Sequence, residues 1–330
     1  MKKKHIHILA TGGTIAGQAA SETATTGYQA GAIGVEELLA AVPELRDVAE
    51  VSGETIAAID SKDMTSEIWL HLAVRTQELL QRDDVDGVVI THGTDTLEET
   101  AYFLHLTVHS DKPVVLTGAM RPATALSADG PMNLLQAVLV AADPEACGCG
   151  VLVVLNGRID GAREVTKMHT TALDTFQSPE TGALGTVQDG QPVFYHIPLR
   201  AHTVDSEFAV TRQTKLPKVA ILYGHADDDG FLVKAACEAG VKGIVYAGMG
   251  NGSIPWPVVQ ELTKAVGQGV LVVRSTRGAA GRVVYAEEVY EDFAFIPSDT
   301  LNPQKARVLL QLALLQTHKH EEIRAMFARY

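Results

Sequence analysis

The chain of 330 residues has few cysteines, no excess of basic residues and no long apolar run. Three cysteines are too few, and odd in number, for a disulfide framework in so large a chain. Lys and Arg number 27 against 40 Asp and Glu, and the resulting net charge of −13 argues against nucleic acid as the main partner. No apolar run approaches the roughly 18 residues that a membrane-spanning helix needs. We therefore expect neither a nucleic-acid-binding nor a membrane protein.

The N-terminus bears on the compartment. Lys2, Lys3 and Lys4 look like the basic start of a signal peptide, but the apolar stretch 6–10 that follows is too short for one. It is also interrupted by His7. We expect a cytoplasmic protein, or a periplasmic one if a signal peptide has been removed from the chain.

Short apolar runs alternate with helical patterns along most of the sequence, which is typical of buried parallel strands in βαβ units. The predicted strands cover residues 5–9, 87–90, 113–116, 151–155, 219–223, 243–247 and 270–273. The predicted helices cover residues 35–41, 66–81, 97–108, 131–141, 230–239, 257–266 and 303–315. Asn302 followed by Pro303 predicts an N-cap at the start of the last helix.

The alternation lapses between about 190 and 216, which predicts a connection between domains. We expect a two-domain α/β protein. A larger N-terminal parallel-sheet domain of flavodoxin-like type covers residues 1–195, a linker covers 196–216, and a smaller C-terminal α/β domain covers 217–330.

The segments after the strands deserve most weight, because ligands of open parallel sheets bind beyond the carboxyl ends of the strands. The first strand runs into Gly12-Gly13-Thr14, where glycines expose backbone N–H groups and Thr14 presents a hydroxyl. A phosphate-binding turn or a purely structural turn would look similar. However, neither the P-loop pattern nor the dinucleotide fingerprint is present, which weakens the nucleotide interpretation.

Two hydroxyl- and carboxylate-bearing segments follow other strands. Thr94 and Asp95 lie where a strand meets a helix, so they could cap that helix, or Asp95 could pair with the ammonium group of a small substrate. Asp60 and Ser61 follow the apolar stretch 56–59 and by the same logic would line the site.

Other candidates are open to a plainer interpretation. Lys167 is either a solvated cation or, if desolvated, a neutral base. Residues 17–34, around Tyr28, have the composition of an active-site lid or of an ordinary surface loop. The glycine-rich loop that ends at Ser253 could make a polar contact or only a turn, and Glu288 would by default be solvated. The histidines lack metal-ligand spacing, so we predict no metal and no cofactor.

Together these segments resemble the bacterial-type L-asparaginase family, in particular its type II and glutaminase-asparaginase branch. The segment 11–17 (TGGTIAG) looks like the first signature of that family, and 91–100 (THGTDTLEET) looks like the second. Residues 119–122 (AMRP), 127–131 (SADGP) and 301–307 (LNPQKAR) also fit, so the resemblance spans the chain from end to end.

The resemblance implies a hydrolase that releases ammonia from L-asparagine, with some activity on L-glutamine. It implies that Thr14 is the nucleophile, that Tyr28 helps to activate it, and that Thr94 and Lys167 form a second hydroxyl–amine group. Substrate binding would fall to Ser61 for the α-carboxylate and to Asp95 for the α-ammonium group, with Asp60, Ser253 and Glu288 beside them. The same resemblance implies that Glu288 enters the site of a neighbouring subunit, in intimate dimers that build a homotetramer.

Two departures from the family pattern stand out. Asp60 and Lys62 flank Ser61 where many members have small and amide or acidic residues, so the carboxylate-binding corner carries different charges. The first cysteine is Cys147, so the first-domain disulfide of secreted relatives cannot form. Two other functions stay open at this point: a nucleotide-binding oxidoreductase on a similar fold, and a non-catalytic amino-acid sensor on the same scaffold.

Overall fold

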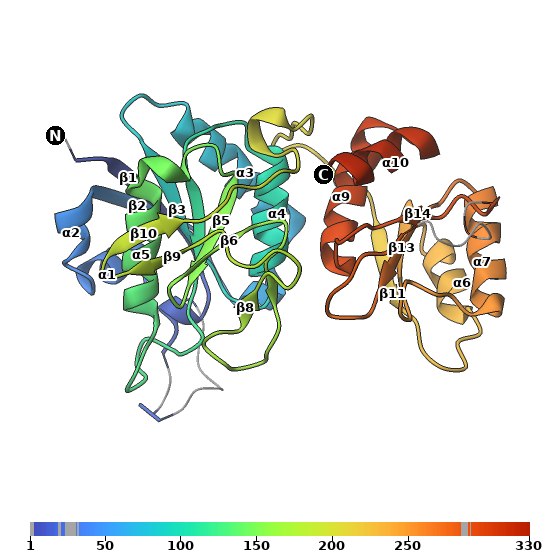
Figure 1. The fold of residues 1–330 in the computed structure, drawn as a ribbon, viewed down its shortest axis with the longest axis horizontal. Helices are drawn as coiled ribbons and strands as arrows, with labels where there is room; N and C mark the ends of the chain where they lie inside the picture. Colours follow the sequence, from blue (N-terminus) through green and yellow to red (C-terminus); the bar gives the residue numbers. More distant parts are fainter. Residues whose placement is uncertain (1–2, 19–20, 24–30, 32, 285–289, 291) are drawn as a thin grey trace. The chain divides into compact units, whose positions relative to one another are not determined.

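A computed structural model describes residues 3–18, 21–23, 31, 33–284, 290 and 292–330 (Figure 1). Contacts divide the chain into two compact units, residues 1–214 and 215–330. Each unit is built around its own sheet.

In its described residues the first unit has an eight-stranded sheet, in the order β10-β9-β6-β5-β4-β3-β1-β2. Five neighbouring strands are parallel: β1 (His5–Gly12), β2 (Glu50–Ile59), β3 (Gly87–Thr91), β4 (Val114–Thr117) and β5 (Val151–Leu155). Their order, 2-1-3-4-5, is that of flavodoxin-like proteins. The expected fold class is thereby confirmed. Three antiparallel strands extend the sheet beyond β5: β6 (Arg158–Gly161), β9 (Gly185–Gln188) and β10 (Gln191–Phe194).

Helices cover both faces of this sheet, as Figure 1 shows. On one face lie α1 (Val35–Ala40), α2 (Leu45–Val48) and α5 (Gly130–Ala142), and on the other lie α3 (Ser66–Leu80) and α4 (Leu97–Thr107). One core forms where Ile6, Ile8 and Val89 of the strands pack against Leu134 and Val138 of α5. Continuous apolar strands can be buried on both faces only in such a layered arrangement.

Short elements complete the first unit. They are the 3₁₀ turns η1 (Thr14–Ala16), η2 (Ser61–Asp63), η3 (Pro144–Ala146) and η4 (Thr203–Asp205), and a two-stranded hairpin of β7 (Thr166–Lys167) and β8 (Phe176–Gln177). Two of these turns and β7 carry residues that the sequence marked as site candidates.

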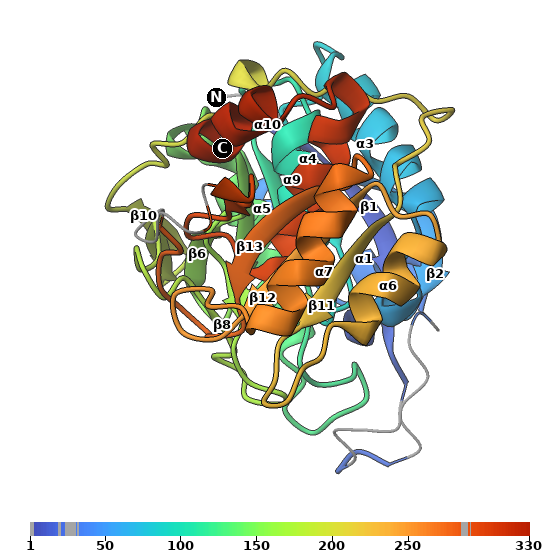
Figure 2. The same cartoon turned by 90° about the vertical axis from the view of Figure 1, so that its right-hand side faces the viewer.

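The second unit has a parallel sheet in the order β11-β12-β13-β14. The strands are β11 (Val219–Tyr223), β12 (Gly243–Gly248), β13 (Leu271–Thr276) and β14 (Ile296–Pro297). Figure 2 shows α6 (Phe231–Glu238) and α7 (Trp256–Gly267) in front of this sheet and α9 (Pro303–Gln316) behind it; α10 (His320–Arg329) follows α9. Asn302 caps α9, because its Oδ1 accepts the N–H of Lys305 at 3.0 Å. This confirms the predicted start of that helix.

The boundary between the two units lies near the C-terminal end of the expected linker, not at its start. Most of the segment 196–216 belongs to the first unit, which extends to Thr214. The physical reason is packing: Phe208 is buried, and Ser206 donates a hydrogen bond to the carbonyl oxygen of Leu106 in α4. A segment without alternating strands and helices can still belong to a domain when buried side chains and hydrogen bonds attach it to that domain.

Candidate active site

Three loops meet at the carboxyl ends of β1, β3 and β2. Gly13 has a positive φ of 80°, and a Cβ built there would lie 2.3 Å from the backbone nitrogen of Gly93. A Cβ on Gly93 would in turn lie 2.6 Å from Oγ of Ser61. Only glycine fits at these two positions. Since β1 and β3 are neighbours whose connections leave in opposite directions, this is the switch point where such sheets bind ligands.

Thr14 follows Gly13 directly and opens the turn η1. Its side chain is buried, and its carbonyl oxygen accepts the N–H of Gly17 at 2.8 Å. The turn is held from a second side, because Ala123 donates its N–H to the carbonyl oxygen of Gly17. The backbone thus fixes Thr14 beside the loop after β3.

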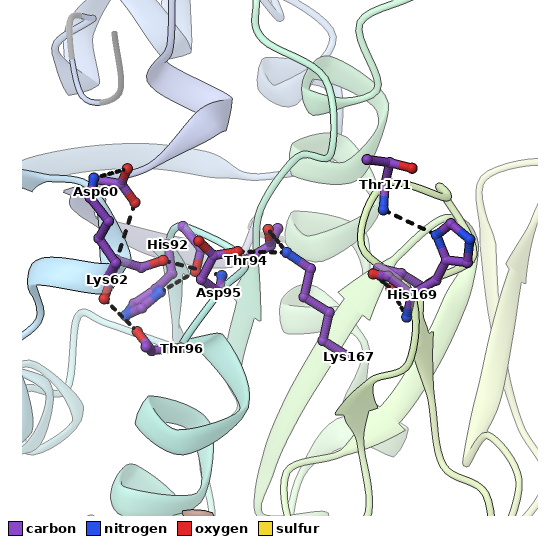
Figure 3. Close-up of polar contacts among 12 residues, drawn as sticks. Asp60, Lys62, His92, Thr94, Asp95, Thr96, Lys167, His169 and Thr171 are labelled. Carbon is purple, nitrogen blue, oxygen red and sulfur yellow. Dashed lines mark hydrogen bonds and ion pairs between the residues drawn. The ribbon is translucent and has the colours of Figure 1, made fainter. Parts of the chain in front are cut away.

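Lys167 joins the two candidate residues that follow β3. Its Nζ donates to Oγ1 of Thr94 at 3.0 Å and lies 2.7 Å from Oδ1 of Asp95 (Figure 3). The Lys167 side chain is only 16% exposed, whereas that of Asp95 is 58% exposed. Lys167 is therefore not a solvated surface cation. The exposed side of the Asp95 carboxylate is thus chemically able to accept a cationic group, and the Lys167 amine donates to the Thr94 hydroxyl.

The hairpin β7–β8 positions Lys167. Lys167 is paired across the hairpin with Phe176, whose ring is buried. The turn that follows is fixed by His169, whose Nδ1 accepts the N–H groups of Thr171 and Ala172 (Figure 3). Thr175 accepts the N–H of His169 at 2.8 Å and closes the turn. The pairing with Phe176 and the hydrogen-bonded turn together position Lys167.

Ser61 connects the loop after β2 to the same place. Its Oγ accepts the N–H of Asp95 at 3.2 Å, and its carbonyl oxygen accepts the hydroxyl of Thr96 at 2.8 Å. Asp60 caps the turn η2 and forms an ion pair with Lys62, with 2.5 Å between Oδ2 and Nζ. The charged corner that the sequence indicated is thus an Asp60–Lys62 pair, exposed beside a buried Ser61.

His92 belongs to the site's framework, although the sequence suggested no role for it. The indole of Trp69 donates to Oγ1 of Thr100, that hydroxyl donates to Nε2 of His92, and Nδ1–H of His92 donates to the carbonyl oxygen of Gly93. Complete burial lowers the pKa of His92 to about 4, so the ring is neutral and this tautomer is fixed. Its place between a strand and Gly93 was the available signal.

Asp129 holds the loop after β4. Its two carboxylate oxygens accept the N–H groups of Met120 and Arg121, each at 2.9 Å. Asn133, one turn further along α5, donates to the carbonyl oxygen of Gly118 at 3.0 Å. Hydrogen bonds therefore connect the motif at 119–122 to the motif at 127–131. In the sequence, the available signal for the role of Asp129 was an acidic residue followed by Gly and Pro at the start of a predicted helix.

Three candidate residues remain. Tyr28 and Glu288 fall outside the described residues. Ser253 lies in the second unit, in a tight loop where it exchanges two backbone hydrogen bonds with Met249. In the part of the chain that the structure describes, no group of three or more His, Cys, Asp and Glu side chains could hold a metal ion. Nor do the described helices include one with the length and apolarity to cross a membrane.

Comparison with known proteins agrees with this geometry. The family "Asparaginase, N-terminal" matches residues 5–200, and "Glutaminase/Asparaginase C-terminal domain" matches residues 218–327. "L-asparaginase 2" of Bacillus subtilis (strain 168) is 54% identical over 327 residues, covering 99% of this chain and 86% of its own. "Glutaminase-asparaginase" of Pseudomonas fluorescens biotype A is 45% identical over 331 residues, covering 100% of this chain and 91% of its own.

A solved structure gives the same result. It is described as "Probable Cytoplasmic L-asparaginase from Campylobacter jejuni", is 51% identical, and superposes with a TM-score of 0.97 over 99% of this chain and 100% of that one. The two matched families together span most of the sequence, and the structural match covers both units. The chain therefore belongs to the asparaginase family.

Proposed function

We propose that the chain hydrolyses the side-chain amide of L-asparagine to L-aspartate and ammonia. The observation that carries the proposal is the contact of Lys167 with both Thr94 and Asp95, beside the Gly13–Gly93 contact that brings the Thr14 loop to the same place. Similarity over the whole chain to proteins named L-asparaginase supports it.

Thr14 is the proposed nucleophile. Its hydroxyl oxygen forms a bond to the amide carbon, and Tyr28 helps to remove its proton; the C–N bond then breaks and ammonia leaves with that proton. Water hydrolyses the resulting acyl-enzyme to aspartate and restores Thr14. A threonine hydroxyl needs such activation at neutral pH. Backbone N–H groups of the glycine-rich loops would stabilise the oxyanion by roughly 3–4 kcal/mol per key donor.

The substrate's opposite charges decide how it is held. Asp95 is proposed to bind the α-ammonium group together with Glu288 of a neighbouring subunit, and the hydroxyl of Ser61 to bind the α-carboxylate. The exposure of the Asp95 carboxylate and the contact of Ser61 with the Asp95 backbone support this division. Asp60 and Ser253 are proposed as further substrate-binding residues.

L-Glutamine is the proposed second substrate, and a dual-specificity glutaminase-asparaginase is the alternative. The relative from Pseudomonas fluorescens, which carries that double name, supports it. One methylene group in a pocket changes binding by only about 1–3 kcal/mol, so the ratio of the two activities has to be measured.

A homotetramer built from intimate dimers is the proposed assembly. Four apolar residues alternate along β10 and the segment after it, and all are exposed in the single chain: Val193 (43%), Tyr195 (62%), Ile197 (63%) and Leu199 (96%). We call them the apolar stripe. Four large exposed apolar side chains within seven residues support an association site in this segment. The proposed compartment is the cytoplasm, which suits the free thiols of Cys147, Cys149 and Cys237.

The test is ammonia release from L-asparagine and from L-glutamine, side by side, for the wild type, Thr14→Ala and Thr14→Ser. We expect Thr14→Ala to lower kcat by several orders of magnitude without unfolding the protein, because the attacking oxygen is lost. Thr14→Ser keeps a hydroxyl and should retain measurable turnover. Near-normal turnover in Thr14→Ala would contradict the nucleophile assignment. A wild type that binds asparagine but releases no ammonia would instead be a sensor.

A further inference from the structure

Arg274 of β13 is a charged side chain that is only 1% exposed. Its Nη1 donates to the carbonyl oxygen of Asn251 at 2.5 Å, and its Nη2 donates to that of Val284. Its guanidinium carbon lies 4.5 Å from the ring centroid of Tyr290. One buried cation thus contacts two segments that are far apart in sequence: the loop 249–254 after β12, and the two described ends, 283–284 and 290, of the segment after β13.

The two segments are also tied to each other. The Oδ1 of Asn251 accepts the N–H of Val284 at 3.1 Å, and the hydroxyl of Tyr290 accepts the N–H of Ile254 at 3.0 Å. Gly252 packs between them, because a Cβ there would lie 3.1 Å from Cγ of Arg274 and 3.1 Å from Cγ1 of Val283. The aliphatic stem of Arg274 therefore packs against Gly252, while its guanidinium donates to one carbonyl oxygen of each segment.

Arginine is suited to this place by its shape. A planar guanidinium can donate to two carbonyl oxygens at a fixed angle and stack on an aromatic ring at the same time. An ammonium group is a single point and cannot reproduce that geometry. Burying the charge is costly unless several groups engage it, so the contacts depend on one another.

We infer that Arg274 is a positioning residue that fixes the loop 249–254 against Val284 and Tyr290 and thereby sets the place of Ser253. The inference rests on the proposed function, in which Ser253 and Glu288 bind the substrate. Arg274 thus holds the loop that carries Ser253, without itself being a substrate-binding residue.

The experiment compares the full-length wild type with Arg274→Lys and with a matched control, Arg307→Lys. Arg307 also donates to a backbone carbonyl in the second unit, that of Val219, but has no part in the loop. Hydrogen exchange by mass spectrometry and steady-state kinetics on L-asparagine are measured for each. We expect Arg274→Lys to exchange faster at 249–254, 283–284 and 290 only, and to raise KM about tenfold with kcat within about threefold of the wild type. Arg307→Lys should change neither.

Two results would overturn the inference: unchanged exchange at both segments, or faster exchange with an unchanged KM, which would confine Arg274 to a structural role. If Arg274→Lys does not fold, Tyr290→Phe replaces it, since that variant removes only the hydroxyl that accepts from Ile254; the same two results would count against the inference. A wild type that releases no ammonia defeats the proposed function separately. The exchange data alone then decide whether Arg274 fixes the two segments.

Discussion

His92 links the stability of the first unit to pH. Its pKa is about 4 in the folded chain because the ring is fully buried, against an ordinary value of 6.5 in the unfolded chain. Between those values the unfolded chain binds a proton that the folded chain does not. Stability from this residue is therefore complete above about pH 6.5 and falls as the pH drops toward 4. The difference, 6.5 − 4, corresponds to roughly 3 kcal/mol at about 1.4 kcal/mol per pH unit.

The prediction concerns His92→Gln, which cannot titrate. Between pH 7.5 and pH 4 the wild type should lose roughly 3 kcal/mol more unfolding free energy than this variant. Urea unfolding followed by the fluorescence of Trp69, in a Trp256→Phe background, checks it, because Trp69 lies in the same hydrogen-bonded chain. His7, His71 and His202 also have pKa values lowered by burial, and they are common to both proteins. Equal losses in the two would contradict the assignment.

Single residues differ in how far the sequence could place them. Thr94 and Asp95 stand directly after a clear strand, which is why the sequence marked them as candidates, whereas their contact with Lys167 was implied only by the family resemblance. The hairpin that carries Lys167 could not be predicted, because β7 and β8 are two residues each. The role of His92 could not be predicted from its place between a strand and Gly93 alone, since burial and a fixed tautomer come only from neighbours distant in sequence, such as Trp69 and Thr100.

At the scale of elements, the cap of α9 offers a clean prediction. Asn302→Ala should lower the stability of the second unit by about 1 kcal/mol, because the N–H of Lys305 loses its acceptor. Asn302→Asp keeps an acceptor and should lose far less. Faster hydrogen exchange in the first turn of α9, in Asn302→Ala alone, is the measurement. The same exchange rate in both variants would mean that the side-chain cap is not what holds this end.

The sequence predicted elements well where they are apolar and continuous. The strands β3, β4 and β5 are buried along their whole length, and their runs were evident. By contrast β2 forms the edge of the sheet and is mostly half-buried, so only its last residues gave a strand signal. In β6 the pattern is disguised by an ion pair between Arg158 and the buried Asp160. The hairpin of β9 and β10 carries a sequence signal, the dipeptide Asp189-Gly190. Both residues have the positive φ angles of a tight hairpin turn.

At the scale of the whole molecule, the apolar stripe predicts how copies associate. Replacing Ile197 and Leu199 together with Asp should shift the mass measured by light scattering from four chains to a smaller assembly, because buried charge opposes association. Leu126 is 75% exposed and lies apart from the stripe in sequence, so Leu126→Asp is the control. A tetramer that survives the double substitution would show that these residues do not form the interface.

The contact between Gly13 and Gly93 has a consequence for how variants of the whole protein should be interpreted. Neither residue has a side chain that could take part in a reaction, yet both set the clearance between two loops. If substitutions at positions 13 and 93 abolish activity, the cause is therefore lack of space for a side chain. A mutational survey that took such positions for reacting groups would choose the residue next to the correct one in each loop. The absence of a side chain at Gly13 and Gly93 is therefore as necessary to the site as the hydroxyl groups of the residues that follow them.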